Sequence, residues 1–219
     1  MAAQGLSARE TTVRTIQALG VVAVIRMKDA GKLRAVIDAI AEGGVRAIEV
    51  TMSVPGAVGL IAQLAPVLPS SILFGAGTVT DAATARAVID AGAQYIVSPV
   101  FRREVIDVCH ERGIAVAPGC FTPTEILDAH EYGADVVKVF PATALGPSYI
   151  KDVRAPLPQV RLMPTGGVTL DNAGDWIRAG AIAVGVGSAL LDTRAIEEGR
   201  LEVLTDNARR IVASVASAR

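Results

Sequence analysis

The sequence predicts an α/β protein, a (β/α)8 barrel with an additional helix before its first strand. The first observation is a short pattern that recurs along the chain, in which an amphipathic segment is followed by a glycine and then by a short apolar run. It reads AEGGVRAIEV, DAGAQYIVSP, ERGIAVAPG, EYGADVVKVF and RAGAIAVGVG. Each glycine can end a helix in the left-handed conformation and turn the chain into a strand.

The second observation is the spacing of the apolar runs, which recur roughly every 20 to 26 residues and number eight, the strand count of a closed barrel. The expected strands are 21–26, 47–52, 72–78, 95–100, 114–119, 136–141, 161–166 and 183–187. Helices at about 7–19 and 201–216 are expected to pack at the barrel ends. An open doubly wound sheet is the alternative, but GAGTV at 75–79 lacks the third glycine of a dinucleotide-binding motif.

The composition predicts one domain, residues 1–219, with 51% hydrophobic residues and a formal net charge of -1. Basic residues are scattered and aromatic residues make up only 4%, which argues against a nucleic-acid partner. No apolar run is long enough to span a bilayer, and MAAQGLSARE at 1–10 lacks the apolar centre of a secretory signal. We therefore expect a cytoplasmic protein without a membrane partner.

Metal and thiol chemistry receive little support from the sequence. Cys109 and Cys120 are too few and too isolated for a disulfide framework or a metal site. His110 and His130 fall on the expected polar faces of helices, where most histidines are solvated. We expect no metal ion and no cofactor.

A lysine interrupts the apolar segment VVKVFPA at 136–142. A buried ammonium is costly unless it is paired or neutralised, and desolvation lowers the pKa of a lysine until its free amine can attack a carbonyl. Glu49 stands in the same way inside AIEVTM. If both side chains share the barrel interior, Glu49 can move protons while Lys138 forms an imine. The alternatives are a purely structural ion pair, or a lysine that reaches solvent.

Chemistry in such barrels gathers at the carboxyl ends of the strands. The first expected strand ends in Arg26, and the last two lead into PTGG and GVGS. Loops at these two places commonly hold phosphate through backbone N–H groups. The candidate phosphate-binding residues are Gly166, Gly167, Gly187 and Ser188.

Six segments in chain order resemble the 2-keto-3-deoxy-6-phosphogluconate (KDPG) and 4-hydroxy-2-oxoglutarate (KHG) aldolases, across roughly residues 11–215. They are EVT at 49–51, GAGTV at 75–79, SP at 98–99, KVFPA at 138–142, GPSYIK at 146–151 and PTGGV at 164–168. By this resemblance Lys138 is the Schiff-base lysine and Glu49 the proton donor and acceptor. The resemblance also implies a homotrimer.

The resemblance further assigns residues to the substrate. Thr78 is similar to the threonine that contacts the pyruvyl part, and Thr165 to the threonine that governs stereochemical choice. Pro99 and Phe140 fall in the matching segments and are expected to contact substrate. Where familiar members read EVTLRT, with an arginine for the substrate carboxylate, this chain reads EVTMSV and has Ser53.

A neutral hydroxyl cannot replace a bidentate guanidinium, so either Arg26 or backbone N–H groups are expected to take over this contact. The predicted function is that of a class I aldolase that cleaves KDPG to pyruvate and glyceraldehyde 3-phosphate, and also KHG to pyruvate and glyoxylate. The alternatives are a 2-keto-3-deoxy-6-phosphogalactonate aldolase, a phosphate-binding barrel isomerase or epimerase, and a non-catalytic sugar-phosphate binding protein.

Overall fold

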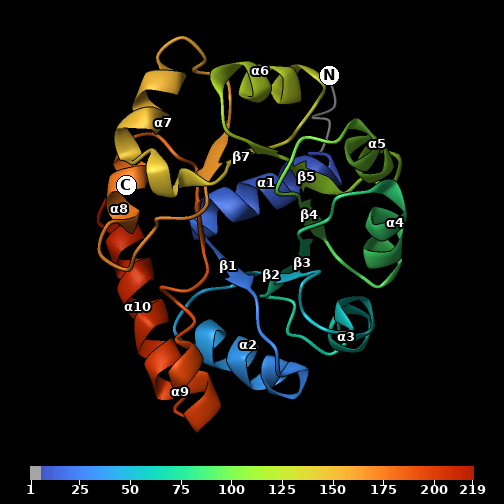
Figure 1. Cartoon of the computed structure of the whole chain (residues 1–219), viewed down its shortest axis with the longest axis vertical. Coiled ribbons are helices and arrows are strands. Elements are labelled where there is room, and N and C mark those ends of the chain that lie inside the picture. The colour runs from blue at the N-terminus through green and yellow to red at the C-terminus, as the bar shows by residue number, and fades with distance from the viewer. Residues whose placement is uncertain (1–5) are drawn as a thin grey trace.

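The computed structural model describes residues 6–219 and has parallel strands that alternate with helices around a curled sheet (Figure 1). The prediction that the chain lacks a secretory signal rests on MAAQGLSARE at 1–10. Residues 1–5 of this segment lie outside the described residues. Within the part that the structure describes, none of the helices has the length and apolar character needed to span a bilayer.

Every predicted strand position is confirmed. The strands are β1 (Val21–Ile25), β2 (Ala47–Thr51), β3 (Leu73–Gly77), β4 (Tyr95–Val97), β5 (Ala115–Ala117), β6 (Gly119–Cys120), β7 (Val137–Val139), β8 (Leu162–Pro164) and β9 (Val184–Val186). The predicted fifth strand is divided into β5 and β6 because Pro118 has no N–H to offer the ladder.

The strands pair in parallel in two sheets. One has the order β5-β4-β3-β2-β1-β9 and the other the order β6-β7-β8. Thr165, just after β8, and Gly185 of β9 form a single parallel bridge between them. The prediction of an α/β fold with parallel strands is therefore confirmed, while the closed eight-stranded (β/α)8 barrel stays a prediction.

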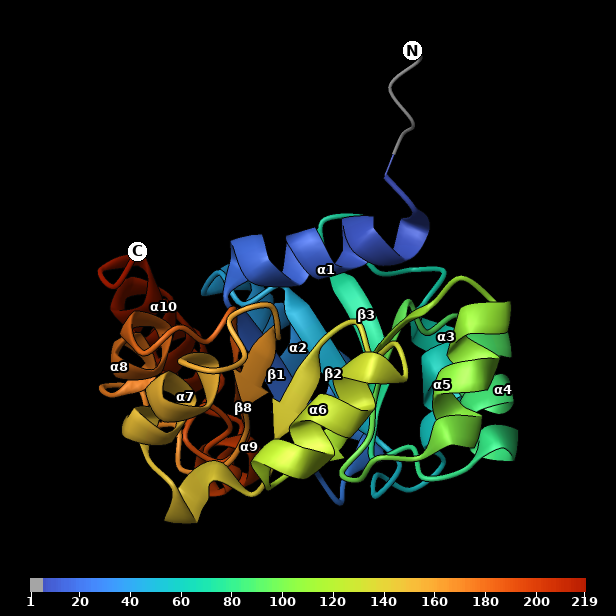
Figure 2. The same cartoon turned by 90° about the horizontal axis from the view of Figure 1, so that it is seen from above.

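The helices surround the strands, with α1 across one end of them and the others on the outside (Figures 1 and 2). They are α1 (Ala8–Leu19), α2 (Leu33–Glu42), α3 (Ala57–Leu64), α4 (Ala82–Asp90), α5 (Arg103–Glu111), α6 (Pro123–Glu131), α7 (Pro147–Arg154), α8 (Ala173–Arg178), α9 (Thr193–Glu198) and α10 (Glu202–Ala216), with short 3-10 turns η1 (Ala30–Lys32) and η2 (Ala142–Ala144). The recurring glycines adopt the positive φ expected after a helix, at Gly44, Gly92, Gly113, Gly133 and Gly180.

Helix α1 lies across the amino-terminal ends of the strands, as predicted (Figure 2). Ser7 caps it by accepting a hydrogen bond from the backbone of Glu10, and its buried face presents Val13 and Ile16. These two side chains pack with residues at the strand starts, among them Val22 and Ala47. This end of the strands is thus closed, and the opposite, carboxyl end is left for a site.

The prediction that the C-terminal helix also packs at a barrel end is wrong. Helix α10 lies beside α2 and α8 in the outer layer of helices (Figure 1). Its Thr205 hydroxyl donates to the Ala39 carbonyl of α2 at 3.0 Å. A side chain at Gly43 would collide with Ala208, so the two helices approach closely at that glycine. The apolar face of α10 therefore covers the flank of the sheet.

Candidate active site

Glu49 lies in the middle of β2 with its side chain inside the curled sheet. It is 1% exposed, and neither carboxylate oxygen has a hydrogen-bond partner among the described residues. Space for the carboxyl group comes from Gly77 of β3, where any Cβ would collide with Glu49 Oε1. Burial raises the pKa of Glu49, against the opposing charges of Lys138 and Arg26.

Lys138 occupies the middle of β7 and is 5% exposed, which confirms that this lysine is buried. Its Nζ lies over the ring of Phe140, 4.8 Å from the ring centroid. Burial lowers the pKa of Lys138, and the nearby Glu49 carboxylate opposes this effect. An acid with a raised pKa therefore faces an amine with a lowered pKa, the combination that proton exchange and amine attack require.

A cavity of about 260 Å³ opens at the carboxyl end of the strands. Its lining residues come from the ends of β1, β7, β8 and β9 and are Val24, Arg26, Phe140, Thr165, Gly166, Gly187, Ser188, Leu191 and Thr193. Six of these lining residues were predicted from the sequence to bind substrate or phosphate, and the structure brings them together. The only charged residue in this lining is Arg26, so the cavity suits an anion.

Thr165 is 7% exposed, and its hydroxyl has no partner among residues 6–219. The side chain lies against Gly185 of β9, where a Cβ would collide with Thr165 Oγ1. A buried hydroxyl in a cavity wall carries a desolvation cost that a substrate hydroxyl or carbonyl can remove.

Gly166 and Gly167 follow Thr165 with φ values of 93° and 71°. A Cβ at Gly167 would lie 2.8 Å from the Cα of Thr143, so this glycine allows η2 to pack on the loop. Gly167 is not among the residues that line the cavity, whereas Gly166, Gly187 and Ser188 are. A role of Gly167 in phosphate binding therefore remains a prediction.

Thr78 follows β3 with φ of 60°, a left-handed conformation that a β-branched residue rarely adopts. Such strain persists only where the surroundings impose it, and it is concentrated at functional sites. Pro99 lies after β4, and its backbone packs so closely on Gly119 that a Cβ there would collide with it. Neither Thr78 nor Pro99 lines the cavity, so their substrate contacts stay predictions.

Ser53 is exposed and lies 2.7 Å from Thr51, oxygen to oxygen. The Thr51 hydroxyl donates its proton to the Ile25 carbonyl at 3.0 Å. The Thr51 oxygen must therefore accept a hydrogen bond from the Ser53 hydroxyl. With its proton used in this way, the Ser53 hydroxyl can act toward other groups only as an acceptor. In this arrangement Ser53 cannot donate to a substrate carboxylate, unlike an arginine.

A sequence profile described as "Aldolase: KDPG and KHG aldolase" matches residues 11–206. The chain belongs to the KDPG and KHG aldolase family. It is therefore an aldolase, a carbon-carbon lyase.

Relatives of this aldolase carry more than one substrate name. It is 36% identical to the 2-dehydro-3-deoxy-6-phosphogalactonate aldolase of Escherichia coli K12, over 78% of this chain and 84% of that protein. It is 33% identical to the KHG/KDPG aldolase of the same organism, over 93% and 96%. The KDPG aldolase of Legionella pneumophila, solved with pyruvate captured at low pH as a covalent carbinolamine intermediate, has a TM-score of 0.84 and 28% identity, covering 91% and 97%.

The prediction that His110 and His130 are solvated is wrong for His110. Its Nε2 is buried without a partner among the described residues, and burial lowers its pKa. Burial also raises the pKa of Cys120 to about 12, which makes its thiol a poor nucleophile. No group of three or more His, Cys, Asp or Glu side chains within residues 6–219 is placed to hold a metal ion.

Tyr95, at the start of β4, was not among the residues predicted from the sequence. This side chain is 1% exposed, and its hydroxyl has no partner among residues 6–219. A signal was available, because an apolar strand that begins with a tyrosine must find a buried partner for the hydroxyl.

Proposed function

We propose that this protein is a class I aldolase that cleaves KDPG to pyruvate and glyceraldehyde 3-phosphate through a Schiff base on Lys138, and that it also cleaves KHG. One observation carries the proposal. A buried lysine with a lowered pKa lies in the same interior as a buried glutamate that has a raised pKa and no hydrogen-bond partner within residues 6–219. Two groups in this state serve nucleophilic attack and proton exchange better than they serve stability.

In the proposed reaction the Lys138 amine adds to the C2 ketone, and the resulting carbinolamine loses water to give an iminium. Glu49, acting through a bound water, takes the proton of the C4 hydroxyl. The C3–C4 bond breaks, its electrons pass to the iminium, and the aldehyde leaves. Protonation of the enamine at C3 and addition of water then release pyruvate and the free lysine. The carbinolamine in the Legionella relative supports the first step.

The phosphate of the substrate is proposed to lie in the cavity beside Gly166, Gly187 and Ser188, with Arg26 as its cation. Glycines admit an anion close to backbone N–H groups, and the guanidinium supplies charge. Because the Ser53 hydroxyl donates to Thr51, we expect backbone N–H groups to hold the carboxylate. The enzyme then depends strongly on its phosphate contacts for orientation.

A lactate-dehydrogenase-coupled assay of pyruvate release tests this proposal. KDPG should exceed KHG in kcat/KM by at least about tenfold, which corresponds to about 1.4 kcal/mol of transition-state binding. Equal efficiency on the two substrates would contradict the assigned phosphate site, and no pyruvate from either would contradict the proposed substrates.

Ser188→Asp is the sharpest variant for the phosphate contacts, because Ser188 is exposed and lines the cavity. The added charge should remove most of the preference for KDPG and leave KHG cleavage largely unchanged, while Ser188→Ala should keep the preference. Substitution of Gly167 would not separate the effects, because its φ of 71° and its contact with Thr143 make any side chain disruptive.

A second candidate is cleavage of the C4 epimer, 2-keto-3-deoxy-6-phosphogalactonate. The E. coli relative of that name is 36% identical, a higher value than for the KHG/KDPG relative at 33%. The Thr165 hydroxyl lines the cavity and has no partner among the described residues, which supports a role for it in distinguishing the two epimers. Assay of both epimers side by side decides between the two substrates, and Thr165→Val should reduce the discrimination.

Two further proposals concern assembly. The strands are proposed to close into one eight-stranded barrel, because a single residue, Pro118, separates β5 from β6 and the Thr165–Gly185 bridge links β8 to β9. The chain is proposed to form the homotrimer that the family resemblance implies, with the exposed Val100 and Phe121 as candidate contacts. Light scattering coupled to gel filtration measures the oligomer, and a monomer would contradict it.

A further inference from the structure

Two adjacent side chains inside the curled sheet leave their oxygens without partners among the described residues. They are Glu49, with both carboxylate oxygens, and Tyr95, with its hydroxyl. Each is 1% exposed. Since a buried polar group without a hydrogen bond is costly, two of them in one interior indicate a shared partner.

The register of the strands brings these groups toward each other. Glu49 of β2 pairs with Gly75 of β3, and Tyr95 begins β4, the next strand along. A Cβ at Gly75 would lie 2.5 to 2.6 Å from Cε1, Cδ1 and Cζ of the Tyr95 ring. The ring therefore crosses the inner face of β3 at its glycine, and the hydroxyl, which is bonded to Cζ, lies toward the strand that carries Glu49.

The Glu49 carboxyl covers Gly77 in the same way that the Tyr95 ring covers Gly75. Residues two apart on one strand face the same side and are about 6.6 Å apart along it. The Tyr95 ring and the Glu49 carboxyl thus cover successive inner-face positions of β3, Gly75 and Gly77.

We propose that Tyr95 is a positioning residue of this aldolase, which donates its hydroxyl proton through one water to the Glu49 carboxylate. The inference rests on the proposed function, because it assigns Tyr95 to the step in which Glu49 takes the C4 proton. The bridge holds the carboxylate over Gly77 and stabilises its charged form. Tyr95 itself exchanges no proton with the substrate.

The other charged groups that face Glu49 are Lys138 from β7 and Arg26 from the end of β1, whereas Gly75 and Gly77 of β3 add none. Burial, followed by the charge of Glu49, raises the pKa of Tyr95 well above its usual value. The hydroxyl therefore stays protonated and able to donate throughout the working pH range. A donor to a carboxylate lowers its pKa, so loss of this donor should raise the pKa of Glu49.

Tyr95→Phe tests the proposal because it keeps the ring and removes only the hydroxyl. We expect kcat to fall about tenfold with KM within about twofold, and the acidic limb of the kcat/KM profile to move up by about 0.5 pH unit or more. Tyr132→Phe is the matched control, since the Tyr132 hydroxyl donates to Asp107 on the outside of the protein. It should leave both the rate and the profile unchanged.

A double substitution shows whether Tyr95 acts through Glu49. Tyr95→Phe should have no further effect on turnover in the Glu49→Gln background, where the carboxylate is absent. An unchanged pH profile together with a raised melting temperature in Tyr95→Phe would overturn the proposal, because the hydroxyl would then be only an unsatisfied group. The wild-type protein is assayed with KDPG in the same series. If it cleaves KDPG and the Tyr95→Phe profile is unchanged, only the role of Tyr95 is wrong. If it does not cleave KDPG, the proposed function is wrong.

Discussion

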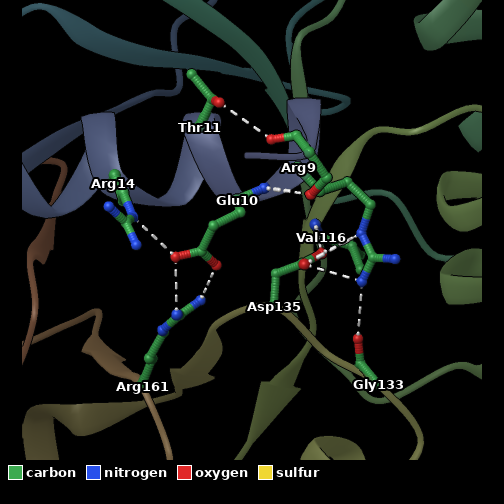
Figure 3. Close-up of polar contacts among 9 residues, drawn as sticks. Arg9, Glu10, Thr11, Arg14, Val116, Gly133, Asp135 and Arg161 are labelled. Atoms are coloured by element: carbon green, nitrogen blue, oxygen red, sulfur yellow. Dashed lines mark hydrogen bonds and ion pairs between the residues drawn. The ribbon is translucent and has the colours of Figure 1, made fainter. Parts of the chain in front are cut away.

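The charged side chains at the two ends of the strands differ in whether they have hydrogen-bond or ion-pair partners. At the amino-terminal end, α1 joins the strand layer through paired charges (Figure 3). Arg9 binds Asp135 at 2.9 Å, and Asp135 also accepts the backbone N–H of Val116 at 3.0 Å. The next residue of α1, Glu10, accepts a hydrogen bond from Arg161 at 2.9 Å.

Toward the carboxyl end, the interior holds Lys138, Glu49 and Thr165, and the oxygens of the latter two have no partner among the described residues. Paired groups hold α1 in place and lower the free energy of the fold. Unpartnered buried groups raise it, and a chain retains them where a substrate will be their partner. The contrast predicts that substitutions at one end change stability and those at the other change catalysis.

The largest expected effect is on catalysis. Lys138→Met keeps the side-chain volume and removes the amine, so cleavage should fall by several orders of magnitude. The unfolding midpoint should stay the same or rise, because an apolar group replaces a buried amine. Turnover close to that of the wild type would contradict the covalent route, and activity strictly dependent on an added divalent ion would indicate a metal-dependent aldolase.

Glu49→Gln tests the second buried charge of the candidate active site. The amide keeps the shape of the side chain but exchanges no protons, so turnover should fall by about 100-fold or more while pyruvate still forms a reducible imine. Burial raises the pKa of Glu49, so folding favours its protonated form and stability falls as the pH rises through the raised value. The variant should lose this pH dependence. Equal loss of turnover and of imine would make Glu49 a structural partner of Lys138.

Asp135→Asn tests the opposite end. The Asp135 side chain is 10% exposed and holds both Arg9 and the Val116 N–H, so we expect about 2 kcal/mol of lost stability in denaturant unfolding. Activity per folded molecule should stay within about twofold. Asp171→Asn is the control, because Asp171 is 84% exposed in its pair with Arg210 and should contribute under about 0.5 kcal/mol. A large loss of kcat in Asp135→Asn would contradict the claim that substitutions at the amino-terminal end change stability and not catalysis.

The smallest effect is expected from Glu10 and concerns pH. Arg161, and then Arg14, hold the pKa of Glu10 below its ordinary value of 4.5. The stability from this pairing is fully present above that value and is lost as the pH falls through the lower folded pKa. Thermal unfolding from pH 5 downward should therefore show a smaller decrease for Glu10→Gln than for the wild type. The difference should stay under about 1 kcal/mol because solvent screens the pair.

The sequence predicted the strands well because buried parallel strands read as apolar runs and helix-ending glycines mark their starts. It also selected Lys138 and Glu49, since a charge inside an apolar strand is visible in one dimension. The division at Pro118 was readable from the sequence, because proline has no N–H for the strand ladder, whereas the lateral position of α10 depends on packing that no local pattern contains. Tyr95 was missed because it becomes conspicuous only when the register sets it beside Gly75 and Glu49.

Borohydride trapping tests directly whether Lys138, which has no ion-pair partner in the part of the chain that the structure describes, performs covalent chemistry. The wild-type protein is incubated with pyruvate, reduced, digested and analysed by mass spectrometry, with Lys151 on the surface as the internal control. We expect a stable pyruvate adduct on Lys138, no adduct on Lys151, and none at any site in Lys138→Met. If the enzyme releases pyruvate from KDPG and yet no adduct forms on Lys138, the Schiff-base role of Lys138 is wrong.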